Sequence, residues 1–223
     1  MRLPTVFALV VLSGVFGCTS KTPPTTKAEA GVPALLDPAS ATEQAPEQFR
    51  VKMVTTKGDV VIEVHRAWAP KGADRFYNMV KRGFFDDVAF FRAIEGFMVQ
   101  FGMHGDPAVQ KAWNRFPIED DPVVESNARG KVTFAKKNSP NSRTTQVFVN
   151  YRDNANLDAM GFAPFGEVIE GMDVLDQLHK GYGEGGPRGK GPAQPEIERN
   201  GNRYLRESFP LLDYAKKTTL VEQ

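Results

Sequence analysis

The feature of this 223-residue chain that most constrains its fold is a series of short, strand-like apolar runs beginning at Phe49. The stretches 49–56 and 60–64 are rich in β-branched residues, and the three residues between them include a glycine, which is typical of a hairpin turn. Short runs of this kind, broken by turn residues, predict an all-β barrel or sandwich. The further runs are 88–94, 97–101, 132–135, 146–150 and 162–168.

Two segments have helical periodicity. In 70–83 and in 171–179, apolar residues recur every three or four positions, so each segment predicts one helix packed on the β-structure. After the second helix, 181–195 is rich in Gly and Pro and is expected to form a loop. The tail 204–220 contains enough apolar residues to predict that it packs on the same domain.

The first 17 residues have the layout of an export signal. A single basic residue, Arg2, precedes the apolar run 6–12, and small residues follow. The run is shorter than the roughly 20 residues that a membrane-spanning helix needs. We expect the signal peptide 1–17 to be removed or processed during export.

Cys18, the only cysteine of the chain, follows this segment and has no partner for an intramolecular disulfide. The stretch 15–18, Val-Phe-Gly-Cys, resembles a bacterial lipobox, with Phe16 at a position that usually carries a small or aliphatic residue. The resemblance implies a lipid on Cys18 that anchors the exported protein to a membrane of the cell envelope. The residue after the cysteine is Thr19 and not the Asp associated with inner-membrane retention. In a double-membraned cell, the protein is therefore expected on the outer membrane, facing the periplasm. Simple secretion is the alternative.

Residues 18–48 separate this N-terminus from the strand-like region. They are rich in Thr, Pro, Ala, Glu and Gln and contain little to bury beyond Leu35 and Leu36. This composition predicts a flexible linker, either a tether that lets the domain stand off the membrane or a tail without a spacing role. The globular domain with its C-terminal extension is expected at 49–223, as a monomer.

Several other functions find no support in the sequence. The net charge of +1 does not predict a nucleic-acid-binding surface. His65, His104 and His179 are widely separated and lack zinc-ligand spacing, and the acidic run 119–121 is expected to be solvated. No serine lies in the small-residue turn that presents a nucleophile. We expect no metal, no cofactor and no hydrolytic triad.

Three segments, in this order, resemble the motifs of the cyclophilins. They are Phe-Phe-Arg-Ala-Ile-Glu-Gly-Phe-Met-Val-Gln at 90–100, Pro-Asn-Ser-Arg-Thr-Thr-Gln-Val-Phe-Val-Asn at 140–150, and Leu-Asp at 157–158 followed by 165–174. The resemblance covers about 49–178. It implies a closed eight-stranded antiparallel β-barrel with two capping helices, and peptidyl-prolyl cis-trans isomerase activity on proline-containing polypeptides.

The same resemblance implies a site. Arg92 would be the donor to the reacting amide, with Gln100 binding the substrate backbone and orienting Arg92, and Phe97 beside them. The remaining positions implied to contact the substrate are Phe91, Met98, Ala135, Gln146, Phe148, Leu157 and Phe162. Taken singly, the apolar ones would more often be barrel core. Asn156 stands where the family often has Trp, so cyclosporin binding does not follow from the resemblance. Phe162 stands near a position that often carries His.

These residue types suit the reaction. Rotation about an X–Pro bond must break amide resonance against a barrier of about 18–20 kcal/mol, but it breaks no bond and needs neither nucleophile nor general base. An apolar pocket and a fixed donor aimed at the twisted amide are sufficient. We expect an isomerase that assists the folding of exported or envelope proteins. The alternative is a lipid-anchored chaperone module that binds peptides in the same groove without needing turnover.

Overall fold

The computed structural model describes residue 1 and residues 32–221, and its main element is a curled nine-stranded antiparallel sheet. The strands follow the order β3-β9-β1-β2-β8-β6-β7-β5-β4. Their bounds are β1 Gln48–Thr55, β2 Asp59–His65, β3 Val88–Ala89, β4 Arg92–Ile94, β5 Met98–Phe101, β6 Lys131–Phe134, β7 Val147–Asn150, β8 Pro164–Glu170 and β9 Tyr214–Leu220.

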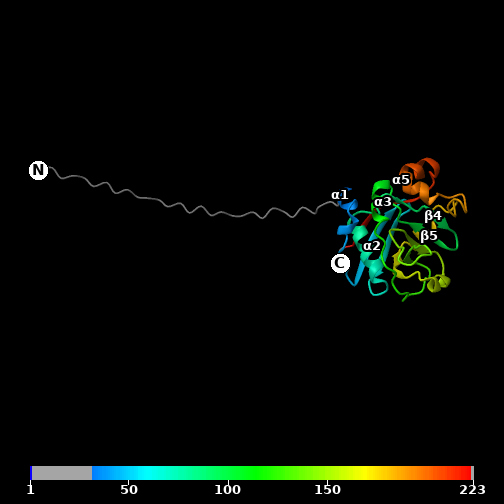
Figure 1. Cartoon of the computed structure of the whole chain (residues 1–223), viewed down its shortest axis with the longest axis horizontal. Coiled ribbons are helices and arrows are strands. Elements are labelled where there is room, and N and C mark those ends of the chain that lie inside the picture. The colour runs from blue at the N-terminus through cyan, green and yellow to red at the C-terminus, as the bar shows by residue number, and fades with distance from the viewer. Residues whose placement is uncertain (2–31, 222–223) are drawn as a thin grey trace.

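Helices connect and cover these strands (Figure 1). The α-helices are α1 Val32–Leu35, α2 Pro70–Lys81, α3 Pro107–Trp113, α4 Met172–Asp176 and α5 Gln194–Ser208, and the 3-10 helices are η1 Pro38–Ser40 and η2 Ala155–Met160. The predicted helices at 70–83 and 171–179 are α2 and α4. The sequence did not predict α3 or α5.

The hairpin of β1 and β2 illustrates why these residues form strands. Buried and exposed residues alternate along β1, and the same period of two continues in β2. Side chains on a strand point alternately to its two faces, so β-branched and apolar residues at every second position line one face. Val51 and Ile62 lie opposite each other in the register and are both buried in the core.

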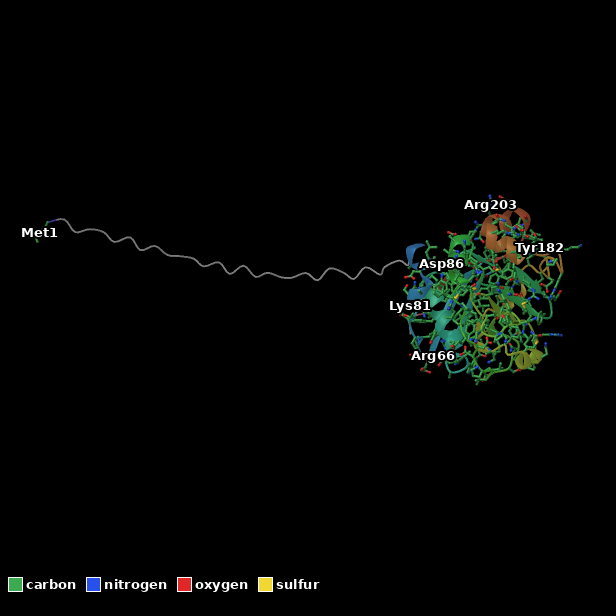
Figure 2. The ribbon with its side chains drawn as sticks, in the orientation of Figure 1. Met1, Arg66, Lys81, Asp86, Tyr182 and Arg203 are labelled. Atoms are coloured by element: carbon green, nitrogen blue, oxygen red, sulfur yellow. The ribbon has the colours of Figure 1, made fainter. Side chains whose placement is uncertain are left out.

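The core lies between this inner face and α2. Phe76 of α2 is fully buried, and its ring lies 5.0 Å from that of Phe165 in β8 and 5.1 Å from that of Phe85. Such tilted aromatic contacts add to the stabilisation that comes from burying the rings. Lys81, at the C-terminal end of the same helix, is exposed at the edge of the molecule. Arg203 of α5 is likewise exposed (Figure 2).

The sheet differs from the predicted closed eight-stranded barrel in its strand count and closure. The run 88–94, which the sequence presents as one strand, divides into β3 and β4, and these are the two edges of the sheet. Only Phe90 and Phe91 separate the edges along the chain, so the sheet must curl to bring them together. The C-terminal tail, predicted to pack on the domain, enters the sheet as β9 between β1 and β3.

The unpredicted helix α5 lies beside α3 (Figure 1). The helix is kinked at Gly201, which has a non-helical conformation with φ +55°. A Cβ there would lie 1.9 Å from the carbonyl oxygen of Gly105, which instead accepts a hydrogen bond from the Asn202 amide. The close approach requires glycine. No apolar side chain lies between Ile197 and Tyr204, so the segment shows no helical periodicity in the sequence.

The part of the predicted linker that the structure describes lies against the domain. The Leu35 carbonyl accepts a hydrogen bond of 2.8 Å from the Trp113 indole, and the Ala45 amide donates to Asp74 at 2.9 Å. Folded contacts therefore begin before Phe49. Residues 2–17 of the predicted signal peptide and Cys18 lie outside the described residues. Within 32–221, no helix has the length and apolar character required to cross a bilayer.

The acidic run 119–121, expected to be solvated, is engaged in ion pairs. Asp121 is buried, accepts from the Lys71 and Gly72 amides at the start of α2, and lies 3.0 Å from Nη1 of Arg143. No side chain at the helix's own N-cap position makes a capping bond. Asp121 therefore stabilises the first turn of α2 from a distant loop, and Arg143 balances its charge.

Replacement of Asp121 tests this assignment. Asp121→Ala removes the closest counter-ion of the buried Arg143 guanidinium, which keeps only the longer contact of 3.5 Å to Asp120, and uncaps α2, so we expect the free energy of unfolding to fall by about 3 kcal/mol. Asp121→Asn keeps an acceptor for the helix amides and should lose less. The measurement is the urea midpoint, with Glu119→Ala on the exposed neighbour as control. Equal midpoints for Asp121→Ala and the control would contradict the assignment.

Candidate active site

Arg92 and Gln100 face each other across the β4–β5 pair. They are direct partners in the antiparallel register, and Arg92 Nη1 donates to Gln100 Oε1 at 2.9 Å. Gln100 is buried, whereas 22% of the Arg92 side chain remains exposed. The register therefore holds a permanently charged, planar donor at the protein surface with a neutral partner beneath it.

An open cavity of about 420 Å³ adjoins this pair. Its apolar part is a cluster in which Met98, Phe148 and Leu157 are buried and Phe97, Ala135 and Phe162 are partly buried. The rings of Phe148 and Phe162 meet edge to face at 5.8 Å. All six residues line the cavity together with Arg92 and Gln100. The structure thus brings the predicted apolar positions together with the predicted donor.

Asparagines position the walls of this cavity. Nδ2 of Asn154, just before η2, donates to the Phe97 carbonyl at 2.9 Å, which ties the turn after β4 to the helix that carries Leu157. Nδ2 of Asn127 donates to the Phe162 carbonyl at 2.8 Å. Because both asparagines are buried, these bonds form in a low-dielectric interior where they hold loop backbone effectively.

The predicted groove residues Ala135 and Gln146 are adjacent. The Ala135 amide donates to the Gln146 carbonyl at 2.9 Å, and only Ala135 lines the main cavity. Gln146 instead continues the polar chain: its Oε1 accepts from Gln100 Nε2 at 2.7 Å and its Nε2 donates to Gln194 Oε1 at 3.1 Å. A row of hydrogen-bonded side chains thus runs from Arg92 to the start of α5.

Phe91 does not join the other predicted substrate-binding residues. It is buried with Ile197, Leu205 and Leu212 in a separate apolar cluster under α5. Adjacent residues in an extended segment point to opposite faces, so Arg92 facing the main cavity turns Phe91 away from it. Phe91 instead lines a neighbouring hollow of about 200 Å³ formed with the 184–192 loop.

The main contact that the sequence did not predict is Glu184, from the segment assigned to a loop. Its carboxylate accepts from Arg92 Nε and Nη2, both at 2.7 Å, and it lines the cavity. Hydrogen bonding to Arg92 holds the pKa of Glu184 below its usual range against the opposing effect of burial. Four other unpredicted residues line the cavity: Lys136, Met160, Arg188 and Gln194.

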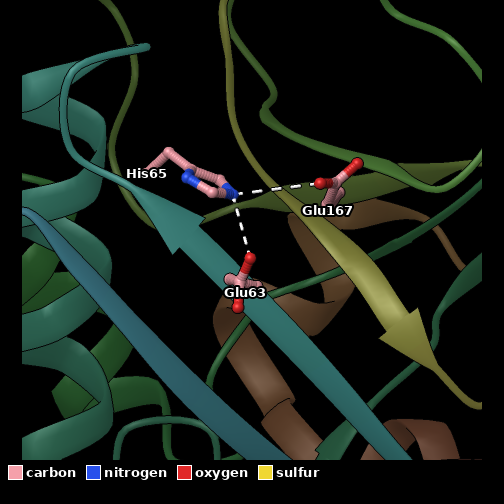
Figure 3. A group of neighbouring side chains, drawn as sticks. All are labelled: Glu63, His65 and Glu167. Atoms are coloured by element: carbon pink, nitrogen blue, oxygen red, sulfur yellow. Dashed lines mark ion pairs between the residues drawn. The ribbon is translucent and has the colours of Figure 1, made fainter.

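A second group of titratable side chains lies on β2 and β8 (Figure 3), and none of its members lines the cavity. Glu63 and Glu167 are cross-strand partners, and Nε2 of His65 lies 3.3 Å and 3.8 Å from their carboxylates. One histidine and two glutamates placed in this way could hold a metal ion. However, Arg50 and Lys131 already pair with the outer carboxylate oxygens at 2.8 Å and 3.0 Å. Two cations balance the two carboxylates, so we interpret the group as an ion-pair cluster.

Comparison with known proteins agrees with this geometry. A family model described as cyclophilin type peptidyl-prolyl cis-trans isomerase/CLD matches residues 50–199, which is more than half of the chain. The chain belongs to the cyclophilin family. The match includes the Arg92–Gln100 pair, the apolar cavity and Glu184, and it supports peptidyl-prolyl isomerase activity.

Curated cyclophilins resemble the chain along most of their own length. A peptidyl-prolyl cis-trans isomerase of Streptomyces antibioticus is 35% identical over 159 residues, covering 66% of this chain and 93% of the relative. Peptidyl-prolyl cis-trans isomerase A of Dickeya dadantii is 34% identical over 159 residues, covering 69% and 83%. Peptidyl-prolyl cis-trans isomerase B of Escherichia coli is 33% identical over 139 residues, covering 59% and 84%.

Solved structures show the same fold. A cyclophilin type peptidyl-prolyl cis-trans isomerase of Cryptosporidium parvum has a TM-score of 0.57 at 19% identity, covering 79% of this chain and 99% of that one. The cyclophilin AquaCyp293 of Hirschia baltica has a TM-score of 0.56 at 18% identity, covering 85% and 80%. At these identities the likeness supports the cyclophilin-like fold alone.

Phe162 allows a test of the cavity as the binding site. Its ring forms one apolar wall and offers no polar group to the reacting amide. Phe162→Ala should therefore weaken binding of a proline peptide more than it slows the reaction. Loss of about 1 kcal/mol of apolar contact raises KM about fivefold, with a smaller change in kcat. Phe116→Ala, at an exposed aromatic ring outside the cavity, is the control. An unchanged KM in Phe162→Ala would place the substrate elsewhere.

Proposed function

We propose that this protein accelerates cis/trans isomerisation of X–Pro peptide bonds in exported or envelope proteins and so assists their folding. The observation that carries the proposal is a guanidinium, Arg92, held by Gln100 at the mouth of an apolar cavity. The family match supports the reaction. The N-terminal signal pattern supports the export of the enzyme and hence this class of client protein.

The geometry suits a reaction that breaks no bond. The proline ring is apolar and fits among Met98, Phe148 and Leu157, which are buried and grip it without polar competition. Rotation of the amide removes its resonance, and the nitrogen becomes more basic as the carbonyl twists. A fixed N–H donor that bonds the twisted form better than the planar form lowers the barrier.

Arg92 keeps donors for this task. A guanidinium has five N–H groups. Three of them bond the oxygens of Glu184 and Gln100, which leaves one N–H on each terminal nitrogen without an oxygen partner among the contacts that the structure describes. The Met98 sulfur lies 3.9 Å from Nη1, at the long end of contact distances. One N–H on Nη2 is therefore available to a substrate, and the second N–H on Nη1 has only this weak sulfur contact to give up.

The Arg92→Ala variant tests the isomerase. Removing a preorganised donor should lower kcat/KM about 10²- to 10³-fold in a protease-free assay on a proline tetrapeptide with the full chain. Arg203→Ala, which removes an exposed arginine on α5, is the matched control and should keep full activity. Equal activity of Arg92→Ala and wild type would refute the role of Arg92. Peptide binding without activity in the wild type would favour the chaperone module.

We further propose that a lipid on Cys18 anchors the protein to a membrane of the cell envelope. The lipobox-like stretch 15–18 and the preceding signal pattern support the anchor. Two acyl chains on one cysteine provide stable anchoring where a single chain is marginal.

Mass spectrometry of the mature N-terminus tests the anchor. We expect an acylated Cys18 as the first residue, and transfer of the protein from the membrane fraction to the soluble fraction in Cys18→Ser. An unmodified N-terminus at another residue would contradict the proposal and leave simple secretion.

A further inference from the structure

Glu184 belongs to a loop that its own backbone holds in place. Gly183 forms an antiparallel bridge with Ala93 of β4, the residue next to Arg92. The Gly191 amide donates to the Glu184 carbonyl at 2.8 Å, and the Gly185 amide donates to Glu184 Oε1 at 2.9 Å. The carboxylate is therefore presented from a closed turn that is attached to the strand carrying its partner.

The contact between Glu184 and Arg92 is of the strong, planar type. Both carboxylate oxygens accept from the guanidinium edge formed by Nε and Nη2, each at 2.7 Å. Parallel bonds of this kind fix the plane of the guanidinium as well as its position. A long arginine side chain otherwise loses up to about 2 kcal/mol of rotamer entropy when it is immobilised.

The far end of the same segment holds the other end of the polar row. Gln194, the first residue of α5, accepts from Gln146, which in turn accepts from Gln100. Arg92 and Gln100 are thus held by contacts that begin at residues 184 and 194, on both sides of one Gly/Pro-rich loop. The loop closes the hydrogen-bond network around the donor.

We propose that Glu184 is a positioning residue that orients Arg92 and acts on the reaction only through it. This inference rests on the proposed function of Arg92. Glu184 bonds the guanidinium edge formed by Nε and Nη2, Gln100 bonds Nη1, and one N–H of Nη2 stays without a partner among the described contacts. The cavity beside Arg92 remains open with the pair formed, so Glu184 does not act as a plug.

A double-mutant cycle on the full chain tests the proposal. Wild type, Glu184→Ala, Arg92→Ala and the double variant are compared in the protease-free proline-tetrapeptide assay. We expect Glu184→Ala to lower kcat about tenfold with KM nearly unchanged, because a misplaced donor costs transition-state stabilisation. In the Arg92→Ala background, the same substitution should cause no further loss. Glu184→Gln, which keeps the shape and one acceptor, should restore part of the activity.

Two variants serve as controls for charge and for the loop. Glu207→Gln removes an exposed carboxylate on α5, and Lys190→Ala changes an exposed residue within the loop; neither lines the cavity. Both should match wild type. A rise in kcat/KM in Glu184→Ala would overturn the proposal, as would an equal loss in the Arg92→Ala background, which would indicate a structural role of the loop.

A spectroscopic measurement separates failure of this inference from failure of the proposed function. The Nε–H resonance of Arg92 should be protected from solvent exchange in wild type and lose that protection in Glu184→Ala. An inactive wild type would refute the isomerase function while this measurement still reports on the contact. An Nε–H signal unchanged by Glu184→Ala would overturn the positioning role whatever the activity.

Discussion

The antiparallel register of β4, β5 and β7 is the constraint on which the site depends. β5 places Gln100 opposite Arg92 on one side and opposite Phe148 on the other, so one residue joins the charged donor to the apolar cavity. A slip of one residue would turn every side chain of the strand to the opposite face. Phe91 shows the effect within the native structure, since one position away from Arg92 it packs under α5 instead.

Two arginine–carboxylate pairs in this protein serve different purposes because their exposure differs. Arg143 and Asp121 are 3% and 1% exposed, so removing either partner leaves a buried charge without its closest counter-ion, and the pair is structural. Arg92 and Glu184 are 22% and 36% exposed, so solvent screens their attraction and the pair adds little to stability. Its effect is geometric, because two parallel bonds fix the direction of the remaining N–H groups.

The curled sheet supplies a rigid support, and connecting segments supply much of the site. β4, β5 and β7 carry Arg92, Gln100 and Phe148, whereas η2 carries Leu157 and the loop before α5 carries Glu184. Segments of this kind would ordinarily be mobile. Here the side chain of Asn154 and the backbone bonds around Glu184 attach them to neighbouring strands. A reaction without proton transfer needs such fixed placement more than it needs tuned titratable groups.

The sequence by itself determined the all-β class, the helices α2 and α4, the Arg92–Gln100 pair and the six residues of the apolar cluster, because periodicity and dense local motifs are properties of neighbouring residues. It did not determine the split of 88–94 into two edge strands, the place of β9 in the sheet, or α5 with its break at Gly201. It also presented Glu184 as part of a featureless loop and Asp121 as a solvated acid. Each of these depends on contacts between segments far apart in the chain: Glu184 lies 92 residues from Arg92, and Arg143 lies 22 residues from Asp121. Local patterns carry no record of such partners, so only the tertiary structure decided which charges meet and how the donor is held.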